Sequence, residues 1–499
     1  MATRNVESGR DALPPSGPVY KVYKRRFWGL IQLVLLNIVV SWDWLTFSSI
    51  STTAAEHFKV SESAINWMST GYLFAFCAAS PTLSSSVVIF TLNKGGPKPA
   101  IIITSSLLLA GNWIRYAGTR ARGGMFGVAM FGQILIGLAQ PFCLSAPTRY
   151  SDLWFSDQGR TSATAVATLA NPLGAALGQL IDSFWATEPD DVPNMVLYIS
   201  IIATIASLPS FILPSAPPTP PSASSASHQN TNNTSEPTPL LPTVTQLLRT
   251  VEFYLILIPF SIYVGFFNSV SSLLNQILSP YGASETEAGI AGGILIVVGL
   301  LVSALISPIT DRYKHYLATI RILVPIVAAS YIGLIFAPAS SAGIGPTYAV
   351  CALLGASSFG LLPVVLEFLV EITYPFSPEV GSTLCWTGGQ LLGAVFILVQ
   401  DALKAGKHAA PPENMRNALI FSAVVAAVAA PLPLCLGLFG RDVRRRRLDV
   451  DRGVDLGEVV GDDDETMDND ADAIRRGDTA GSAGEKGKSR FKWSVSSRQ

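Results

Sequence analysis

Asp43 and Trp44 are neighbours near the end of a long apolar stretch, and both side chains can take part in ligand chemistry. The face of a tryptophan ring attracts quaternary ammonium groups, and a carboxylate at membrane depth attracts a cation or binds a proton. The pair therefore predicts a site for a small organic cation, with proton binding at Asp43 as a second expectation. The alternative is a tryptophan of the membrane interface beside a solvated carboxylate.

A second group of polar side chains recurs along a later apolar stretch. Three of them follow one another at spacings of four and three residues, which places them on one face of a helix. A polar face in a membrane helix must contact protein or water and not lipid. We expect these residues to line a substrate cavity, with helix–helix hydrogen bonding as the alternative. The three residues, followed by the two that flank them, are Asn268, Ser272, Asn275, Tyr263 and Gln276.

Gln390 lies between glycines in the stretch Gly388-Gly-Gln-Leu-Leu-Gly393. Small residues allow two helices to approach closely. The amide of Gln390 keeps a hydrogen-bond donor and an acceptor at the depth of the cavity. Gln390 is therefore available for a polar contact within the membrane.

Glu367 and Glu371 stand one helical turn apart in another apolar stretch. An acid within the membrane is a functional candidate, because a charge at that depth costs at least about 2.5 kcal/mol. Both acids lie near the predicted cytosolic end, so we expect them to gate the path by pairing with Arg149 or Arg160, with substrate contact as the alternative. Arg115, near the predicted outer end of its stretch, is expected to extend its head group to the interface.

Membrane-spanning helices must position these side chains. The chain is 49% hydrophobic and 14% charged, with a mean hydropathy of +0.40, whereas soluble proteins carry about 25% charged residues. A span needs about 20 mainly apolar residues to cross a hydrocarbon layer of about 30 Å. Pro147 and Pro172 interrupt the fourth and fifth candidates. The predicted spans are 27–50, 64–91, 99–118, 124–147, 161–184, 194–213, 251–278, 287–309, 317–337, 346–370, 381–402 and 416–440.

The distribution of Lys and Arg predicts the orientation. Both residue types gather before the first span and after the last, so both ends are expected in the cytosol. A segment rich in Pro, Ser, Thr and Asn separates the sixth span from the seventh, and such a composition is typical of disorder. The prediction is an all-α membrane protein with two six-helix bundles. Its parts are a cytosolic tail 1–26, a bundle 27–213, a disordered linker 214–250, a bundle 251–440 and a disordered cytosolic tail 441–499.

Six spans on each side of a central linker resemble the layout of major facilitator transporters, whose halves are parallel repeats. Cytosolic turns follow the second and the eighth span at matching positions. In the family this turn pairs an acid with nearby cations and clamps neighbouring helices. Asp311 and Arg312 keep that pair in the second turn, whereas Asn93 stands in place of the acid in the first. The alternative is a turn with positive-inside residues.

Longer motifs resemble the feline leukaemia virus subgroup C receptor-related proteins, which are solute carrier family 49. The resemblance implies that Trp44 is the cavity tryptophan and that Gln390 makes polar contact with the substrate. It also implies a carrier of choline and ethanolamine, of haem, or of pyridoxine-like vitamins. Asp43 departs from related choline carriers, which tend to have a neutral amide there. The motifs are residues 263–278 and 360–375, with 154–165, 171–176 and 66–69 in support.

We therefore expect a transporter that moves a small organic solute across a lipid bilayer by alternating access, with a choline-like cation or amine nutrient as the first substrate class. Haem or another porphyrin is the alternative substrate, although all four histidines fall outside the predicted spans. A receptor or sensor without transport is the alternative of another class. Protons are a further candidate partner.

Other classes of function find no support in the sequence. No nucleophile–base set, cofactor motif or metal-ligand spacing occurs, and the net charge of −1 does not suit nucleic-acid binding. We expect neither an enzyme nor a protein with a cofactor, a metal or a nucleic-acid partner. The plasma membrane is the expected location. An acidic dileucine-like pattern from Glu236 to Leu241 makes a vacuolar or endosomal membrane the alternative.

Overall fold

The computed structural model describes residues 21–79, 87–121, 123–155, 157–219, 221, 247–313, 315–373 and 378–436. Within these ranges the regular structure is helical. Among the described residues, eleven helical segments are long and apolar enough to cross a membrane. The second predicted span, 64–91, is not one of them, because it is described in two pieces on either side of residues 80–86. The protein is therefore an all-α, multi-pass membrane protein, as the sequence predicts.

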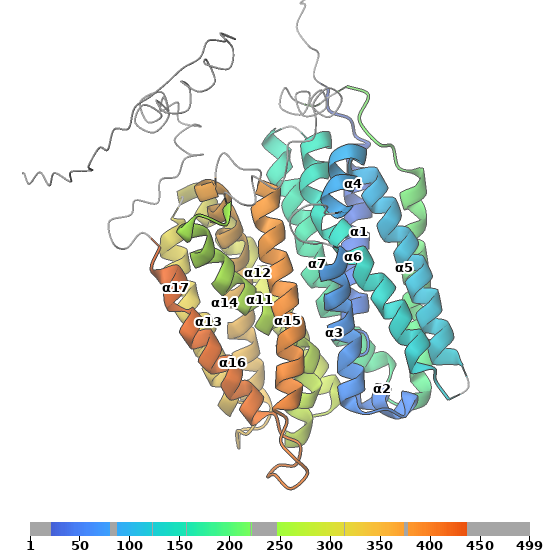
Figure 1. Cartoon of the computed structure of the whole chain (residues 1–499), viewed down its shortest axis with the longest axis vertical. Coiled ribbons are helices and arrows are strands. Elements are labelled where there is room, and N and C mark those ends of the chain that lie inside the picture. The colour runs from blue at the N-terminus through green and yellow to red at the C-terminus, as the bar shows by residue number, and fades with distance from the viewer. Residues whose placement is uncertain are drawn as a thin grey trace, which may run out of the picture. The chain divides into compact units, whose positions relative to one another are not determined.

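The first half of the chain forms one group of helices, from blue to green in Figure 1. Two short 3₁₀ helices, η1 (Pro189–Asp191) and η2 (Leu208–Ile212), flank its last long helix. The α-helices are α1 (Arg26–Leu45), α2 (Ser51–Phe58), α3 (Glu62–Ala79), α4 (Val87–Gly95), α5 (Pro97–Arg120), α6 (Phe126–Trp154), α7 (Asp157–Trp185) and α8 (Val192–Ser207).

The second half forms the other group, from green to red in Figure 1. A 3₁₀ helix, η3 (Ser279–Tyr281), follows its first long helix. The α-helices are α11 (Val251–Leu278), α12 (Glu285–Tyr313), α13 (Tyr316–Phe336), α14 (Gly345–Thr373), α15 (Pro378–Ala402), α16 (Arg416–Ala429) and α17 (Pro431–Leu434).

The helix ends differ most from the predicted spans at the first, the fourth and the last of them. The fourth was predicted to end at residue 147, but α6 continues to Trp154. The first span was predicted to reach residue 50, but α1 ends at Leu45 and the separate helix α2 begins at Ser51. The last was predicted as 416–440, whereas α16 ends at Ala429 and α17 follows. Pro147 and Pro172 lie inside α6 and α7 without ending them, since neighbouring groups can satisfy the backbone that a proline frees.

The two halves repeat the same packing. Helix α1 packs on α7, and α11 packs on α15 at the corresponding place in the second half. Glycines permit the close approach: a Cβ on Gly174 would lie 2.0 Å from the carbonyl oxygen of Ile38, and one on Gly265 would lie 3.0 Å from Leu392. This correspondence is the signature of parallel repeats.

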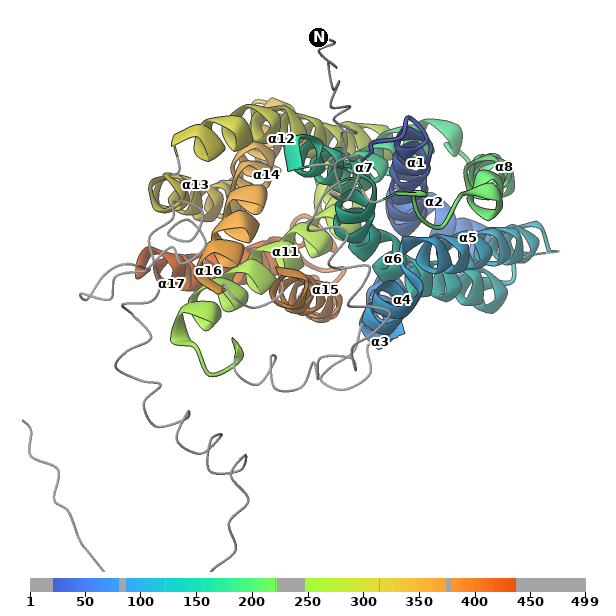
Figure 2. The same cartoon turned by 90° about the horizontal axis from the view of Figure 1, so that it is seen from above.

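Two pairs of helices join the halves. Helix α7 packs on α12, and α3 packs on α15, as the view in Figure 2 shows. The space between the halves is lined by residues of α1, α6, α7, α11, α13, α14, α15 and α17. The predicted domain boundaries stay predictions, because most of the linker and everything after residue 436 lie outside the described residues.

Candidate substrate cavity

A cavity lies between the two halves and holds about 1220 Å³ of empty space, counting the part that is open to solvent. At one limit it is lined by Trp44 of α1, Asn268 of α11 and Gln390 of α15. At the other limit it reaches Ile320, four residues after the start of α13, and Leu436, beyond α17. The cavity therefore extends from the middle of the bundle toward the end that carries the starts of α11 and α13.

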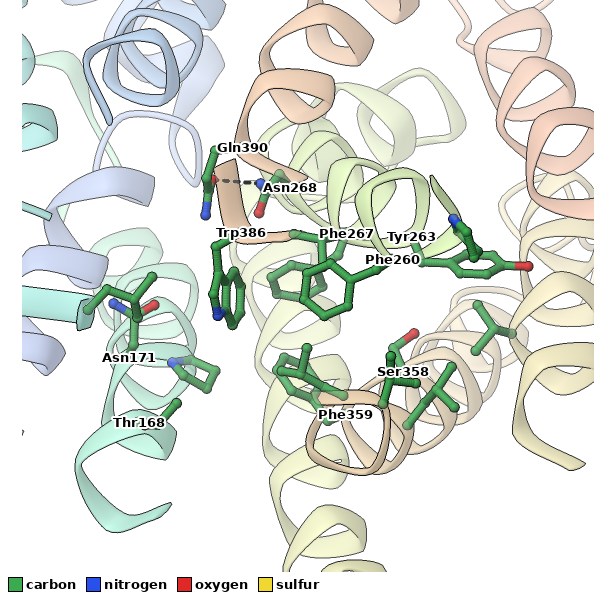
Figure 3. Close-up of a pocket in the computed structure, with 18 of the residues that line it drawn as sticks. Thr168, Asn171, Phe260, Tyr263, Phe267, Asn268, Ser358, Phe359, Trp386 and Gln390 are labelled. Atoms are coloured by element: carbon green, nitrogen blue, oxygen red, sulfur yellow. Dashed lines mark hydrogen bonds between the residues drawn. The ribbon is translucent and has the colours of Figure 1, made fainter. Parts of the chain in front are cut away.

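Aromatic rings make up much of the wall. Trp44 comes from the first half, and Phe260, Tyr263, Phe267, Phe359 and Trp386 come from the second. Figure 3 shows Trp386 below Gln390 on α15, with Phe260 and Phe267 of α11 beside it. The Trp386 and Phe260 rings meet edge to face, with centroids 5.6 Å apart. An aromatic, concave site with a few polar groups is typical of small-molecule binding.

The polar groups of the wall are amides and hydroxyls. Asn268 donates a hydrogen bond from Nδ2 to Oε1 of Gln390 at 2.9 Å, which joins α11 to α15. Three further polar atoms have no hydrogen-bond partner within the described part of the chain: Nε1 of Trp44, Oε1 of Gln140 and Nδ2 of Asn171. Unpaired buried polar atoms are costly, so these donors and this acceptor are the groups that a bound solute would satisfy.

The wall carries almost no ionisable group. Among its described lining residues, the phenol of Tyr263 is the single titratable side chain. That hydroxyl donates to the carbonyl oxygen of Ala426 at 3.0 Å, so it faces α16 and not the cavity. A cation here is consequently attracted by ring faces and amide dipoles without a formal counter-charge.

Asp43 lies outside this wall, although the sequence suggested direct contact with the substrate. Its carboxylate is fully buried within the first half, where Nη2 of Arg115 lies 2.6 Å from Oδ1 and Nδ2 of Asn112 lies 2.7 Å from Oδ2. The expectation that Arg115 extends to the interface is wrong, because its side chain is also fully buried. A charge at this depth requires a partner of opposite charge, and Asp43 and Arg115 are each other's partner.

The same cluster holds the end of α1. Arg115 donates to the backbone oxygen of Asp43 at 3.2 Å, and Gln133 donates to that oxygen at 2.8 Å and to the oxygen of Trp44 at 3.4 Å. The last carbonyl groups of a helix have no intrahelical partner and need others when buried. Arg115 and Gln133 thus fix the position at which α1 ends, and Trp44 stands at that end.

Side chains of the two halves bond directly at the opposite end of the bundle, which holds α2 and the α15–α16 connection and is called the α2 end below. Gln276 of α11 donates to Oδ1 of Asn66 at 2.7 Å, and Asn66 donates to Asp401 at 2.9 Å. Nζ of Lys404 lies 2.6 Å from a carboxylate oxygen of Glu62. These contacts join α3 to the second half.

Glu285 makes a second set of contacts across the halves. Its carboxylate accepts hydrogen bonds from the Thr53 hydroxyl at 2.5 Å, the Thr52 amide at 2.9 Å and the Asn275 amide at 2.8 Å. Asn275 also donates to Ser51 at 3.0 Å. The start of α2 is thereby tied to α11 and α12. The cavity is closed at the α2 end by these two networks.

The structure divides the predicted polar face of α11. Asn268 and Tyr263 line the cavity, together with Trp44 and Gln390, and their contact with a substrate stays a prediction. Asn275 and Gln276 belong to the contacts at the α2 end. Ser272 is buried, and its hydroxyl has no partner among the described residues.

Of the predicted gating residues, Arg149 is the one whose side chain belongs to the described part of the structure. Arg149 lies half-buried in α6. The gating role stays a prediction, because the other side chains lie outside the described part of the structure: Asn93, Arg160, Asp311, Arg312, Glu367 and Glu371.

Sequence reasoning missed Gln140, Asn171 and Trp386. Trp386 precedes Gln390 by four residues, a spacing that places both on one helical face and could have identified it. Gln140 and Asn171 each precede a proline, and no spacing in the sequence relates one to the other.

Comparison with known proteins agrees with this architecture. The model of the Major Facilitator Superfamily matches residues 33–397. The chain belongs to the major facilitator superfamily and, within it, to solute carrier family 49. It is a membrane transporter of a small solute and not an enzyme.

Two relatives illustrate the family. The chain is 31% identical over 392 residues to solute carrier family 49 member A3 of Danio rerio, covering 78% of this chain and 81% of that protein. It is 32% identical over 391 residues to the choline/ethanolamine transporter FLVCR1 of Felis catus, covering 76% of this chain and 68% of that protein.

Solved structures support the fold. A D-xylose–proton symporter matches with a TM-score of 0.61 at 15% identity, over 84% of this chain and 98% of that chain. A bacterial homologue of the lysosomal transporter Spinster, in an inward-facing and occupied conformation, matches with a TM-score of 0.59 at 12% identity, over 85% of this chain and 99% of that chain.

Proposed function

We propose that this protein moves choline, ethanolamine or a similar amine-bearing nutrient by facilitated transport, with the cavity as the substrate site. The observation that carries the proposal is the wall itself, in which the Trp44 ring and other aromatic rings meet amides and the described lining residues include no Asp, Glu, His, Lys or Arg. Such a wall suits a compact organic cation, since ring faces attract the ammonium group and amides hydrogen-bond a hydroxyl. The named activity of the FLVCR1 relative supports the same class.

Alternating access would proceed between the present state and one with the α2 end open. The positive-inside rule predicts that the α2 end faces away from the cytosol. The cavity would then face the cytosol in this state, and the networks around Asn66 and Glu285 would separate during the transition. The solute biases this equilibrium to the extent that it binds one state more tightly than the other.

A haem substrate has less support. The described lining residues include no His, Cys or Met to contact the iron and no Lys or Arg to pair with carboxylates. We keep the plasma membrane as the proposed location, with a vacuolar or endosomal membrane as the alternative. Both rest on sequence patterns alone.

For a coupling proton, Asp182 of α7 is a better-supported candidate than Asp43. Trp42 donates from Nε1 to one Asp182 oxygen at 2.8 Å, and the other oxygen has no hydrogen-bond partner in the described part of the chain. The Arg115 guanidinium is already bound to Asp43, Asn112 and Gln133. We propose that any proton-dependent step is lost in Asp182→Asn.

The test is thermal stabilisation of the purified protein by choline, ethanolamine, haemin and a monocarboxylate. A ligand at 100 times its dissociation constant stabilises by about 2.7 kcal/mol. We expect stabilisation by the amines in the wild type and its loss in Trp44→Ala. Stabilisation by haemin or the carboxylate alone would contradict the proposed substrate class.

A further inference from the structure

Trp386 is an aromatic residue of the cavity wall, where its indole ring can contact a bound solute. It lies on α15 in the second half, whereas Trp44 lies on α1 in the first half, and both line the same cavity. It precedes Gln390 by one helical turn, so α15 presents an indole and an amide on one face. Figure 3 places Asn171 of α7 on the wall across from Trp386.

The surroundings of Trp386 are those of a contact surface and not of a core residue. Trp386 is half-buried, while Trp44 is 4% exposed. The Phe260 ring packs against the Trp386 ring edge to face, at an interplanar angle of 90°. A large aromatic side chain that is neither packed on all sides nor directed at lipid offers its free surface to the cavity contents.

The absence of charge in the described wall leaves ring faces as the means of selecting a cation. A cation selected without a carboxylate needs more than one ring, because each aromatic face contributes a modest attraction. Trp is the strongest of the three aromatic side chains in this role. The two tryptophans of this cavity come from opposite halves.

We propose that Trp386 is a second specificity-determining residue that contacts the ammonium group of the substrate, so that a cation is held by tryptophans from both halves. This inference rests on the proposed function. Contact from both halves also provides the differential binding that alternating access requires, because movement of α15 relative to α1 changes the contacts of the bound cation.

The experiment compares choline with 3,3-dimethylbutan-1-ol, an uncharged compound of the same shape. Binding of each is measured by isothermal titration to the purified full chain for the wild type, Trp386→Leu and Trp386→Phe. We expect Trp386→Leu to weaken choline about tenfold, a change of about 1.4 kcal/mol, and the uncharged compound less than about threefold. Trp386→Phe should fall between the wild type and Trp386→Leu for choline.

Trp67→Leu is the matched control, because Trp67 on α3 is 46% exposed and lies outside the cavity lining. It should leave both affinities unchanged. Equal loss of both compounds in Trp386→Leu, or no loss of either, would overturn the inference. If Trp386→Leu does not fold, an unchanged choline preference in Trp386→Phe overturns it instead. If the wild type does not bind choline more tightly than the uncharged compound, the proposed substrate class itself is refuted. The wild type alone gives that result, so it is distinct from a failure of the Trp386 inference.

Discussion

The Arg115 guanidinium lies 2.6 Å from the Asp43 carboxylate, and neither side chain is exposed. The two residues join α1 to α5 immediately before Trp44, which lines the cavity. Arg115 and Gln133 also bind the carbonyl groups at the end of α1. The pair therefore holds Trp44 at the cavity wall, and we propose that Asp43 acts as a positioning residue in this state.

Replacing Asp43 alone should lower the stability of the protein more than replacing Asp43 and Arg115 together. Asp43→Leu leaves Arg115 buried without a counter-charge, which typically costs 3–5 kcal/mol, whereas replacing a buried ion pair by apolar residues is often close to neutral. We expect Asp43→Leu to melt at a clearly lower temperature than the wild type. The double variant Asp43→Leu/Arg115→Met should recover most of that loss in thermal unfolding of the purified protein. A double variant as unstable as the single one would mean that the loss does not come from an unpaired Arg115 charge.

The role of Asp43 in proton coupling has its own test. Because Asp43 is already neutralised by Arg115, Asp43→Asn should lower uptake at every pH without moving the pH profile of transport in reconstituted vesicles. Asp182→Asn should flatten any pH dependence, since one Asp182 oxygen is without a partner among the described residues. Asp190→Asn, at an exposed position of η1, serves as the control and should change neither property. A profile moved by Asp43→Asn would return that residue to the coupling role.

Gln390 offers a test of the sign of the substrate charge. Gln390→Glu keeps an oxygen that can accept the Asn268 hydrogen bond, and it adds a negative charge to a wall that has none in its described part. A cationic substrate should bind about tenfold more tightly, a gain of about 1.4 kcal/mol, and a carboxylate substrate should bind more weakly. Equilibrium binding at fixed pH measures both. Tighter binding of an anion would contradict the cation proposal.

Lys404 links the halves at the α2 end, where Glu62 lies 2.6 Å and Glu413 3.5 Å from its Nζ. Lys404→Met should favour separation of the halves by up to about 1 kcal/mol, a factor of about five in population, as expected for a partly exposed pair. Distances between spin labels on Glu56 and Lys407, which are both exposed, would report the opening. An unchanged distance distribution would show that the pair does not hold this end closed.

The pH range of this contact follows from the pKa of Lys404. Burial lowers that pKa, but the carboxylates of Glu62 and Glu413 raise it more, so the pKa lies above its ordinary value of 10.5. A raised pKa means that the contribution of the cation is complete below 10.5 and is lost as the pH rises through the higher value. We therefore expect the contribution of Lys404 to closure to be constant between about pH 6 and 9. A loss of that contribution within this range would contradict the assignment.

The sequence by itself determined that the chain spans a membrane with two sets of helices, because apolar length is a local property that hydrocarbon thickness fixes. It also predicted substrate contact for Trp44, Asn268 and Gln390 from helical periodicity and a family resemblance, and these three residues line the cavity. Only the tertiary structure shows which polar side chains contact one another. Arg115 reaches Asp43 from another helix, and Asn275 and Gln276 lie beyond the cavity limit because α11 continues to the α2 end. Which polar side chains meet depends on how the helices are positioned against one another, and the spacing within one span does not specify that positioning.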